Sequence, residues 1–356
     1  MSILADTLRD PDLATEQLGR LLDAYPLAQM SGKRVFMTGA TGFIGSWLLR
    51  AVAQLNLRGS RVSVHALSRD PARFLARHPY FAGADWLSFT KGDVRDYTLV
   101  RRRFDLVIHG ATDTSPDAAA RALELFETMI GGTQRVLRQA RASGAGRVLV
   151  LSSGAIYGER PAAPGGIDER SAGAFDPSDP ADVYGEGKRA MEMQASCYGR
   201  EHGIETVIAR CFAFAGHGLP RHLAIAQLVE GAADNGRIVI RGDGKAVRSY
   251  LDASDLAVWL LALAVKGRAG AAYNVGASEA LSIEQLAARI CSALGIEPRV
   301  EVRGEIPTQR RLFYVPDISR ICNELGVSVW TDLDTSIRRM AAHCRGMHPN
   351  NTRGHQ

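Results

Sequence analysis

The chain has 356 residues, of which 46% are hydrophobic and 23% charged, and its net charge is +5. This ordinary globular balance suits two domains, or one large domain with a lobe. Apart from Arg101-Arg102-Arg103 the basic residues are scattered, which argues against a nucleic-acid-binding protein. No apolar run approaches the roughly 18 residues of a membrane span, so we expect no membrane partner.

The cysteines argue against both a disulfide framework and a zinc site. The five of them form no C-x-x-C pair and no zinc-like spacing with histidine. An odd, scattered set is typical of reduced thiols. The N-terminus carries acidic residues and lacks a long apolar core, so it does not match a signal peptide. We therefore expect a cytoplasmic protein with no bound metal.

An amphipathic helix is predicted within residues 1–30, ahead of the first strand. Asp10-Pro11 is a helix-start signal, and four leucines then follow helical spacing: Leu13, Leu18, Leu21 and Leu22. We expect this extension to pack on the core, with a dimer contact as the alternative.

A glycine-rich turn follows the first predicted strand, residues 35–37. Gly39, Gly42 and Gly45 stand three residues apart, and helical apolar spacing begins directly after them. Gly39 allows a tight turn, Gly42 lets a pyrophosphate approach the backbone, and Gly45 lets the helix pack closely on the strand. The N-terminus of the helix then offers N–H groups to the phosphates. This context predicts a dinucleotide-binding turn.

Strands and helices alternate along the rest of the chain. We predict further strands at residues 61–67, 86–89, 105–109, 147–151 and 204–209, and helices at 121–142, 184–198 and 281–294. This alternation predicts an α/β fold with a doubly wound parallel sheet, that is, a Rossmann domain.

The end of the second predicted strand bears on the choice of cofactor. NAD-binding enzymes usually place an acid there for the adenosine ribose. This chain has Ser68 and Arg69 instead, and arginine is the expected partner of a 2′-phosphate. We therefore favour NADP(H). NAD(H) is the alternative if Asp70 hydrogen-bonds the adenosine ribose.

A tyrosine and a lysine four residues apart, Tyr184 and Lys188, share one helix face. A free tyrosine is a poor acid or base at neutral pH, but a nearby ammonium favours its phenolate. Tyr184 is therefore a candidate to give a proton to a ketone oxygen or to take one from an alcohol.

The segment TGATGFIGS, followed in order by ALSRDP, Ser152-Ser153 and Tyr184-x-x-x-Lys188, resembles the extended short-chain dehydrogenase/reductase family. That family consists largely of enzymes that modify nucleotide sugars. The resemblance covers about residues 33 to 340 and includes the C-terminal sequence segments RRLFYVPDISR and NELG. It implies a nucleotide-sugar substrate, a homodimer formed through two Rossmann helices, and a smaller α/β C-terminal substrate lobe.

The resemblance also implies an organisation of the chain into parts. We expect a Rossmann domain at 31–210, which the chain re-enters at about 247–276. The substrate-binding lobe is then expected at 211–246 and 277–345, and the polar tail 346–356 is expected to be mobile.

The resemblance assigns roles to individual residues. Ser153 matches the catalytic serine or threonine that holds the reacting oxygen, and Lys188 contacts the nicotinamide ribose. Asp93 is expected to accept a hydrogen bond from the adenine amine. The expected cofactor-binding residues are Gly39, Thr41, Gly42, Phe43, Ile44, Gly45, Ser68, Arg69, Asp93, Val94, Gly110, Ala111, Thr112 and Lys188.

The expected substrate contacts are Ser153, Ala213, Arg248 and Arg310. Arg248 stands where relatives clamp the nucleotide diphosphate, a role that suits a guanidinium. Two positions depart from the family pattern: Ala213 replaces a usual asparagine at the sugar diphosphate, and Met129 replaces the asparagine of a proton relay.

Three reactions compete. A 4,6-dehydratase of this family needs an acid pair directly after the catalytic serine or threonine, but here those residues are Gly154 and Ala155. A 4-epimerase typically retains NAD, whereas a 4-keto reductase consumes its cofactor and is often NADPH-linked. Arg69 and the missing acids favour the reductase, with the epimerase as the alternative. A non-catalytic dinucleotide-binding regulator would not need Tyr184 and Lys188.

Overall fold

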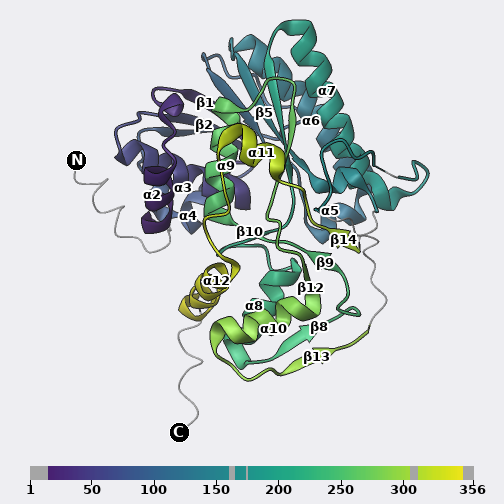
Figure 1. Ribbon diagram of the computed structural model, residues 1–356. Coiled ribbons are helices and arrows are strands. Elements are labelled where there is room, and N and C mark those ends of the chain that lie inside the picture. Colours follow the sequence, from purple (N-terminus) through teal and green to yellow (C-terminus); the bar gives the residue numbers. More distant parts are fainter. Residues whose placement is uncertain (1–14, 160–164, 174, 305–311, 348–356) are drawn as a thin grey trace.

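The computed structural model describes residues 15–159, 165–173, 175–304 and 312–347 (Figure 1). A seven-stranded parallel sheet covered by helices forms the larger part, and a smaller lobe lies below it in this view. The predicted α/β fold with a doubly wound parallel sheet is confirmed.

The sheet has the strand order β11-β6-β5-β4-β1-β2-β3, and all neighbouring pairs are parallel. Its central strands are runs of buried residues because helices cover both faces. The strands are β1 (Arg34–Thr38), β2 (Ser63–Ser68), β3 (Leu87–Lys91), β4 (Leu106–His109), β5 (Arg147–Ser153), β6 (Glu205–Cys211) and β11 (Ala272–Val275).

Each predicted strand is present, with ends that differ by a few residues. β2 begins at Ser63 rather than at residue 61, because Arg61 has a φ of 54°, in the left-handed region that a strand excludes. β5 continues two residues beyond its predicted end and so includes Ser153.

The strand order reverses direction at β1, and this reversal places the site. From β1 the chain passes outward to β2 and β3, then crosses to β4 on the other side of β1. In open α/β sheets, ligands bind outside the carboxyl ends of the strands at such a switch point. The carboxyl ends of β1, β2 and β4 are therefore the expected floor of a binding site.

Helices cover the two faces of the sheet over separate hydrophobic cores. On one face lie α3 (Phe43–Leu57) and α9 (Ala253–Lys266), with α2 (Thr15–Ala24) packed on both of them. On the other face, α6 (Ala122–Ala142) and α7 (Val183–His202) pack together. α7 extends four residues beyond its predicted end.

The N-terminal extension packs on the main core, as predicted. Leu18, Leu21 and Leu22 on α2 are buried, with Leu18 fully buried against α3 and α9. Just after α2, the Tyr25 hydroxyl donates to the Leu325 carbonyl oxygen at 2.6 Å. The extension is thus fastened to a C-terminal segment of the chain.

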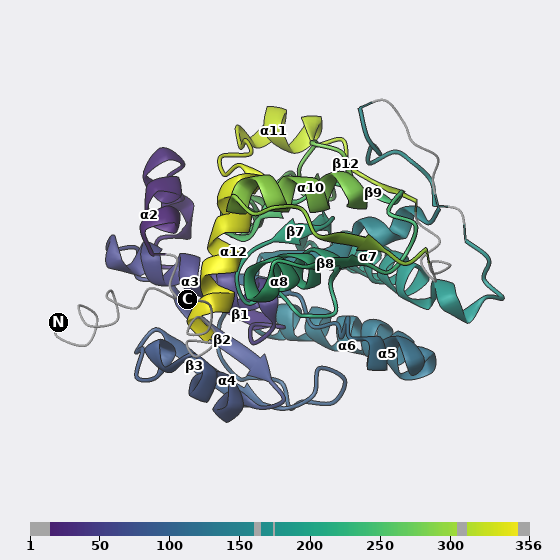
Figure 2. The same cartoon turned by 90° about the horizontal axis from the view of Figure 1, so that it is seen from below.

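The smaller lobe has its own core beneath the sheet. Three helices lie side by side there (Figure 2): α8 (Ala224–Asn235), α10 (Ile283–Leu294) and α12 (Leu333–Met347). The predicted helix at 281–294 begins at Ile283, because Leu281 and Ser282 pair with another strand, and Ser282 caps the helix in a capping box with Gln285.

Short strands outside the main sheet connect it to the lobe and form small sheets of two or three strands. They are β7 (Phe214–Ala215), β8 (Ile238–Ile240), β9 (Val247–Arg248), β10 (Leu251–Asp252), β12 (Leu281–Ser282), β13 (Val300–Val302) and β14 (Phe313–Tyr314). The remaining helices are α4 (Pro71–Arg77), α5 (Pro116–Ala120) and α11 (Ser319–Leu325), with single turns at Ala28–Met30, Pro79–Phe81, Gly154–Tyr157 and Pro180–Asp182.

Within the described ranges, no helix combines the length and the hydropathy of a membrane span. The same part of the chain contains no group of three His, Cys, Asp or Glu side chains arranged to hold a metal ion. All five cysteines are unpaired.

The burial of α2 makes it part of the folded core, and this is testable. We expect Leu18→Ala to lower the free energy of unfolding by about 2–5 kcal/mol, because it leaves a cavity between α2, α3 and α9. Denaturant unfolding measures this change. The exposed Glu16→Ala on the same helix is the control and should change stability by no more than about 0.5 kcal/mol. Equal effects of the two substitutions would contradict the packing role.

Candidate active site

The glycine-rich turn between β1 and α3 has no room for side chains at two of its glycines. Gly39 has a φ of +72°, and a Cβ there would lie 2.4 Å from the Gly110 carbonyl oxygen. A Cβ at Gly45 would lie 2.2 Å from the Gly39 carbonyl oxygen. Gly42 is the N-cap of α3, and its Cβ position meets only one backbone atom, at 3.4 Å. Its bare backbone therefore leaves the α3 N-terminus open to a ligand.

A cavity lies at the carboxyl ends of β1, β2 and β4, where the strand order reverses. Ten of the predicted cofactor residues line it: Gly39, Thr41, Gly42, Ser68, Arg69, Asp93, Val94, Gly110, Ala111 and Thr112. Four charged residues of this lining were not predicted from the sequence: Arg95, Asp113, Arg121 and Glu124. They come from loops and from α6, and no local spacing marks them.

Four predicted cofactor residues lie outside that lining. Gly45 is behind the turn, and Ile44 packs against the main core. The Phe43 ring stacks on Phe214 of β7, with ring centroids 5.2 Å apart. Lys188 approaches the cavity from α7 and reaches Thr112 in its wall.

The end of β2 presents a hydroxyl and a guanidinium to the cavity. Ser68 Oγ lies 3.2 Å from Thr41 Oγ1, and Arg69 is largely exposed, with Nη2 3.9 Å from the Asp113 carboxylate. The Asp70 carboxylate is occupied elsewhere, because it caps α4 by accepting from the Arg73 backbone N–H at 3.0 Å. The acid that follows β2 most closely in sequence thus caps a helix.

Asp93 lines the cavity but already has a partner. Its carboxylate accepts from Arg95 Nε at 2.8 Å and Nη2 at 3.2 Å. The hydrogen bond from Arg95 is the main reason that the pKa of Asp93 is below its ordinary value. Asp93 is therefore an ionised acceptor beside a guanidinium.

Tyr184 and Lys188 lie one turn apart on α7, as their spacing predicts. Lys188 Nζ is 5.8 Å from the centre of the Tyr184 ring. The lysine is buried, and its Nζ donates to Thr112 Oγ1 and to the Leu151 carbonyl oxygen, both at 2.9 Å. Burial lowers the pKa of Lys188 to about 8. The Lys188 ammonium thus lies next to the Tyr184 ring, and its pKa of about 8 is only a little above neutral pH.

Ser153 ends β5, and a tyrosine from the smaller lobe contacts it. Its Oγ accepts from the Ala155 backbone N–H at 3.1 Å and lies 3.3 Å from the Tyr314 hydroxyl. Tyr314 belongs to β14 and is 161 residues away in sequence. Tyr314 had no predicted role, although it lies within the C-terminal segment RRLFYVPDISR that carries part of the resemblance.

The two positions after Ser153 have no proton-transferring groups and no room for larger ones. A Cβ on Gly154 would lie 2.8 Å from three atoms of the Phe212 ring. Ala155 is fully buried beside it. An acidic side chain at Gly154 would therefore have to displace a packed aromatic ring.

Two of the predicted substrate residues, Ala213 and Arg248, lie in segments next to the smaller lobe. The Arg248 guanidinium carbon lies 5.6 Å from the centre of the Tyr314 ring, and its Nη1 donates to the Val247 carbonyl oxygen at 2.8 Å. The Ala213 carbonyl oxygen accepts from the Leu251 N–H at 3.2 Å. Arg310 lies outside the described residues.

A buried polar network links the strand that ends at Ser153 to the helix that carries Lys188. Glu192, one turn beyond Lys188, pairs with Arg210 at 2.8 Å and accepts from Ser152 Oγ at 2.5 Å. Arg210 also donates to the Tyr157 hydroxyl at 2.9 Å. Tyr157 in turn donates to Asn274 Oδ1 at 2.7 Å. The network thereby joins β5, α7, β6 and β11.

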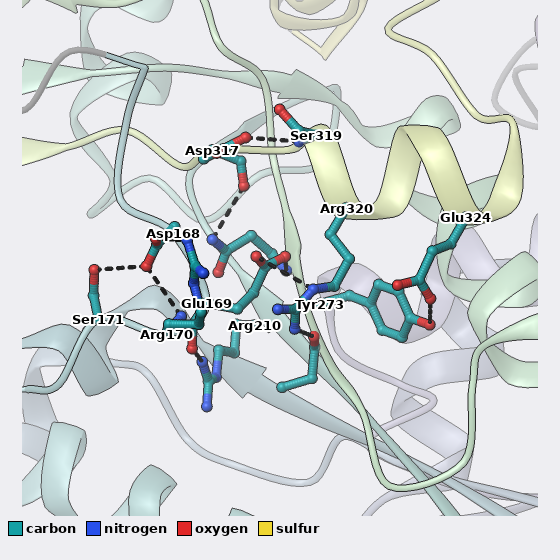
Figure 3. Close-up of polar contacts among 12 residues, drawn as sticks. Asp168, Glu169, Arg170, Ser171, Arg210, Tyr273, Asp317, Ser319, Arg320 and Glu324 are labelled. Atoms are coloured by element: carbon teal, nitrogen blue, oxygen red, sulfur yellow. Dashed lines mark hydrogen bonds and ion pairs between the residues drawn. The ribbon is translucent and has the colours of Figure 1, made fainter.

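The same network fixes the segment around Glu169 (Figure 3). Arg210 Nη1 donates to the Glu169 carbonyl oxygen at 2.8 Å. The Glu169 carboxylate is buried, accepts from the Asn274 backbone N–H at 3.0 Å, and lies 3.7 Å from Arg320 Nε. Neither Glu169 nor Arg320 was a predicted site residue, because their contacts join segments far apart in sequence.

Comparison with known proteins agrees with this arrangement. Residues 35–276 match the model of the NAD dependent epimerase/dehydratase family. A dTDP-glucose 4,6-dehydratase from Streptomyces niveus is 30% identical over 305 residues, which are 83% of this chain and 88% of the relative.

Two solved structures share the fold over nearly their whole length. DesIV, a dTDP-glucose 4,6-dehydratase from Streptomyces venezuelae solved with NAD, is 27% identical with a TM-score of 0.74, over 89% of this chain and 97% of its own. MoeE5, solved with UDP-glucose and NAD, is 25% identical with a TM-score of 0.74, over 88% of this chain and 99% of its own.

The family match spans more than half of the chain and contains the glycine turn, Ser153, Tyr184 and Lys188. The predicted resemblance to this group of enzymes is thus confirmed. The protein belongs to the NAD-dependent epimerase/dehydratase family of extended short-chain dehydrogenases/reductases.

Proposed function

We propose that this enzyme uses NADPH to reduce the 4-keto group of a nucleotide-linked sugar. DesIV was solved with NAD, and MoeE5 with UDP-glucose and NAD, which supports a dinucleotide and a nucleotide sugar as the ligands of this chain. The observation that carries the choice of reaction is the end of β2. There Ser68 and Arg69 line the cavity, while Asp70 caps α4.

The residues of the cavity fit a dinucleotide. A Cβ at Gly39 or Gly45 would collide with backbone atoms, so only the bare turn places the α3 N-terminus at the cavity. That N-terminus suits a pyrophosphate. Arg69 suits a 2′-phosphate, for which a carboxylate in the same place would be repulsive. When bound, the cofactor supplies the hydride.

The protein groups then supply the proton and hold the reacting oxygen. Tyr184 donates its phenolic proton to the ketone oxygen, and the ammonium of Lys188, 5.8 Å from the ring centre, stabilises the phenolate that remains. Ser153 Oγ donates a hydrogen bond to the same oxygen as negative charge develops on it. Arg248 is suited to hold the diphosphate of the substrate.

Dehydration is disfavoured by the same site. The relative from Streptomyces niveus is a 4,6-dehydratase. In this chain the positions that follow Ser153 are Gly154, packed under the Phe212 ring, and the buried Ala155. Neither residue can transfer the protons that an elimination of water requires.

The first test is the dinucleotide that the purified protein carries. The bound molecule is released by denaturation and identified, and NADPH oxidation is then followed with 4-keto nucleotide sugars. An empty site that prefers NADPH, together with turnover, supports the reductase. Tightly held NAD and interconversion of 4-epimers would make the enzyme an epimerase. Failure to oxidise NADPH with any 4-keto nucleotide sugar would reject the reductase.

Catalysis by Tyr184 predicts a separation of turnover from binding. We expect Tyr184→Phe to lower kcat by about 10²- to 10⁴-fold, because it removes the proton donor and leaves the ring in place. The NADPH Kd, measured by fluorescence titration, should stay unchanged. Tyr198→Phe on the same helix is the control and should keep full turnover. A Tyr184→Phe enzyme as active as the parent would support a binding or regulatory protein.

Recognition of the 2′-phosphate by Arg69 predicts a change in cofactor preference. We expect Arg69→Ala to weaken NADPH binding by about 10- to 100-fold, since a charge-assisted hydrogen bond is lost, and to leave NADH binding unchanged. Titration of both dinucleotides measures the ratio. Arg73→Ala, in the helix that Asp70 caps, is the matched control. A parallel loss of NADPH and NADH affinity in Arg69→Ala would contradict the assignment.

We further propose that the protein is a homodimer that pairs through α6 and α7, which lie side by side (Figure 1). Large apolar side chains are exposed on both helices: Leu123 and Phe126 on α6, and Met193 on α7. Two neighbouring helices that both expose large apolar side chains are candidates for a protein interface.

A charge placed on this pair of helices should separate the subunits. We expect Met193→Glu to convert the dimer to a monomer in analytical ultracentrifugation, because the carboxylate would be desolvated at the interface. Val302→Glu, at an exposed position of the smaller lobe, should leave the dimer intact. A parent protein that sediments as a monomer would reject the proposal.

A further inference from the structure

The catalytic lysine is buried without a carboxylate partner. Lys188 is 3% exposed, and Nζ donates to two neutral oxygens, Thr112 Oγ1 and the Leu151 carbonyl. Among the described residues no ion pair involves it. A buried ammonium that forms no ion pair depends strongly on each dipole that solvates it.

Among the described titratable groups around Lys188, Glu192 raises the pKa of the lysine from a distance but forms no ion pair with it. Glu192, one turn further along α7, is held by Arg210 at 2.8 Å. Burial raises the pKa of the Cys211 thiol on β6 to about 12, so this group stays neutral. His109 on β4 is buried between the hydroxyls of Thr38 and Thr133 and is likewise neutral, since burial lowers its pKa to about 3.

Helix α6 also offers no polar group at this place. Met129 is fully buried there, and a Cβ on Gly187 would lie 2.1 Å from its methyl carbon. The thioether thus occupies the space next to the Lys188 segment of α7. The polar contact to the lysine side chain comes instead from the loop that follows β4.

We propose that Thr112 is the positioning residue of Lys188, whose hydroxyl holds the lysine in its ammonium form beside Tyr184. This inference rests on the proposed catalytic role of Lys188. An ammonium has three N–H donors, of which Leu151 and Thr112 take two. The Leu151 acceptor belongs to the backbone of β5 and is present in any variant. The Thr112 hydroxyl is the acceptor that a side-chain substitution removes.

The position of Thr112 connects this contact to ligand binding. Thr112 lines the cavity, so the hydroxyl that holds Lys188 belongs to the wall against which a dinucleotide would lie. The contact fixes the direction of the lysine side chain before any ligand enters. Such a fixed direction reduces the reorganisation that a catalytic group needs.

A direct titration of the lysine tests the inference without any substrate. The chain has only five lysines: Lys33, Lys91, Lys188, Lys245 and Lys266. Protein labelled with ¹³C at lysine Cε is titrated by NMR, and Lys188→Arg identifies the signal of the buried residue. In Thr112→Val the Lys188 midpoint should fall by about one to two pH units, because a hydrogen bond to the charged form is lost.

Two variants separate this effect from a general disturbance of the loop. Thr112→Ser keeps the hydroxyl and should restore the parental midpoint. Thr114→Val makes the same change at an exposed neighbouring position and should leave the midpoint unchanged. Thermal melting of each variant verifies that it is folded. A parental midpoint in Thr112→Val, or an equal shift in Thr112→Ser, would overturn the inference.

Steady-state kinetics then relate the contact to catalysis. We expect Thr112→Val to move the alkaline limb of the kcat profile to lower pH, because the ammonium is lost earlier, and Thr112→Ser to restore the limb. An NMR shift in an enzyme without 4-keto reductase activity would reject the proposed function while keeping the role of Thr112. An unchanged NMR midpoint in an active reductase would reject the role of Thr112 while keeping the proposed function.

Discussion

The backbone contact between the glycine turn and the end of β4 is the constraint on which the site depends. Gly39 lies so close to Gly110 that a Cβ would be 2.4 Å from its carbonyl oxygen. This contact fixes the loop after β4 relative to α3. Two residues further along that loop, Thr112 holds Lys188 at 2.9 Å. A single close approach thus sets both this wall of the cavity and the position of Lys188.

A buried ion pair fixes the other side of the site. Glu192 and Arg210 connect α7 to β6, and Ser152, next to Ser153, donates to the same carboxylate. Both side chains of the pair are about nine-tenths buried. Buried pairs contribute little net stability, but they tolerate few alternative arrangements. We infer that this pair serves mainly to orient the end of β5 relative to α7.

Much of the fold and part of the site were predictable from the sequence, because their signals are local. The apolar strands and the alternation with helices predicted the parallel sheet. The spacing of Gly39, Gly42 and Gly45 predicted the turn, since steric exclusion of side chains acts over a few residues. The i,i+4 spacing of Tyr184 and Lys188 predicted a shared helix face for the same reason. Element ends were less predictable, as with Arg61 at the start of β2.

Only the tertiary structure decided which distant residues complete the site. Tyr314 reaches Ser153 across 161 residues of sequence, and Thr112 reaches Lys188 across 76. The packing of Phe212 on Gly154, which closes that position to an acid, has the same long-range origin. The sequence by itself determined the sheet, the glycine turn and the Tyr-Lys helix face, because local sterics and periodicity specify them. These distant pairs depend on how strands are ordered in space, which no local pattern encodes.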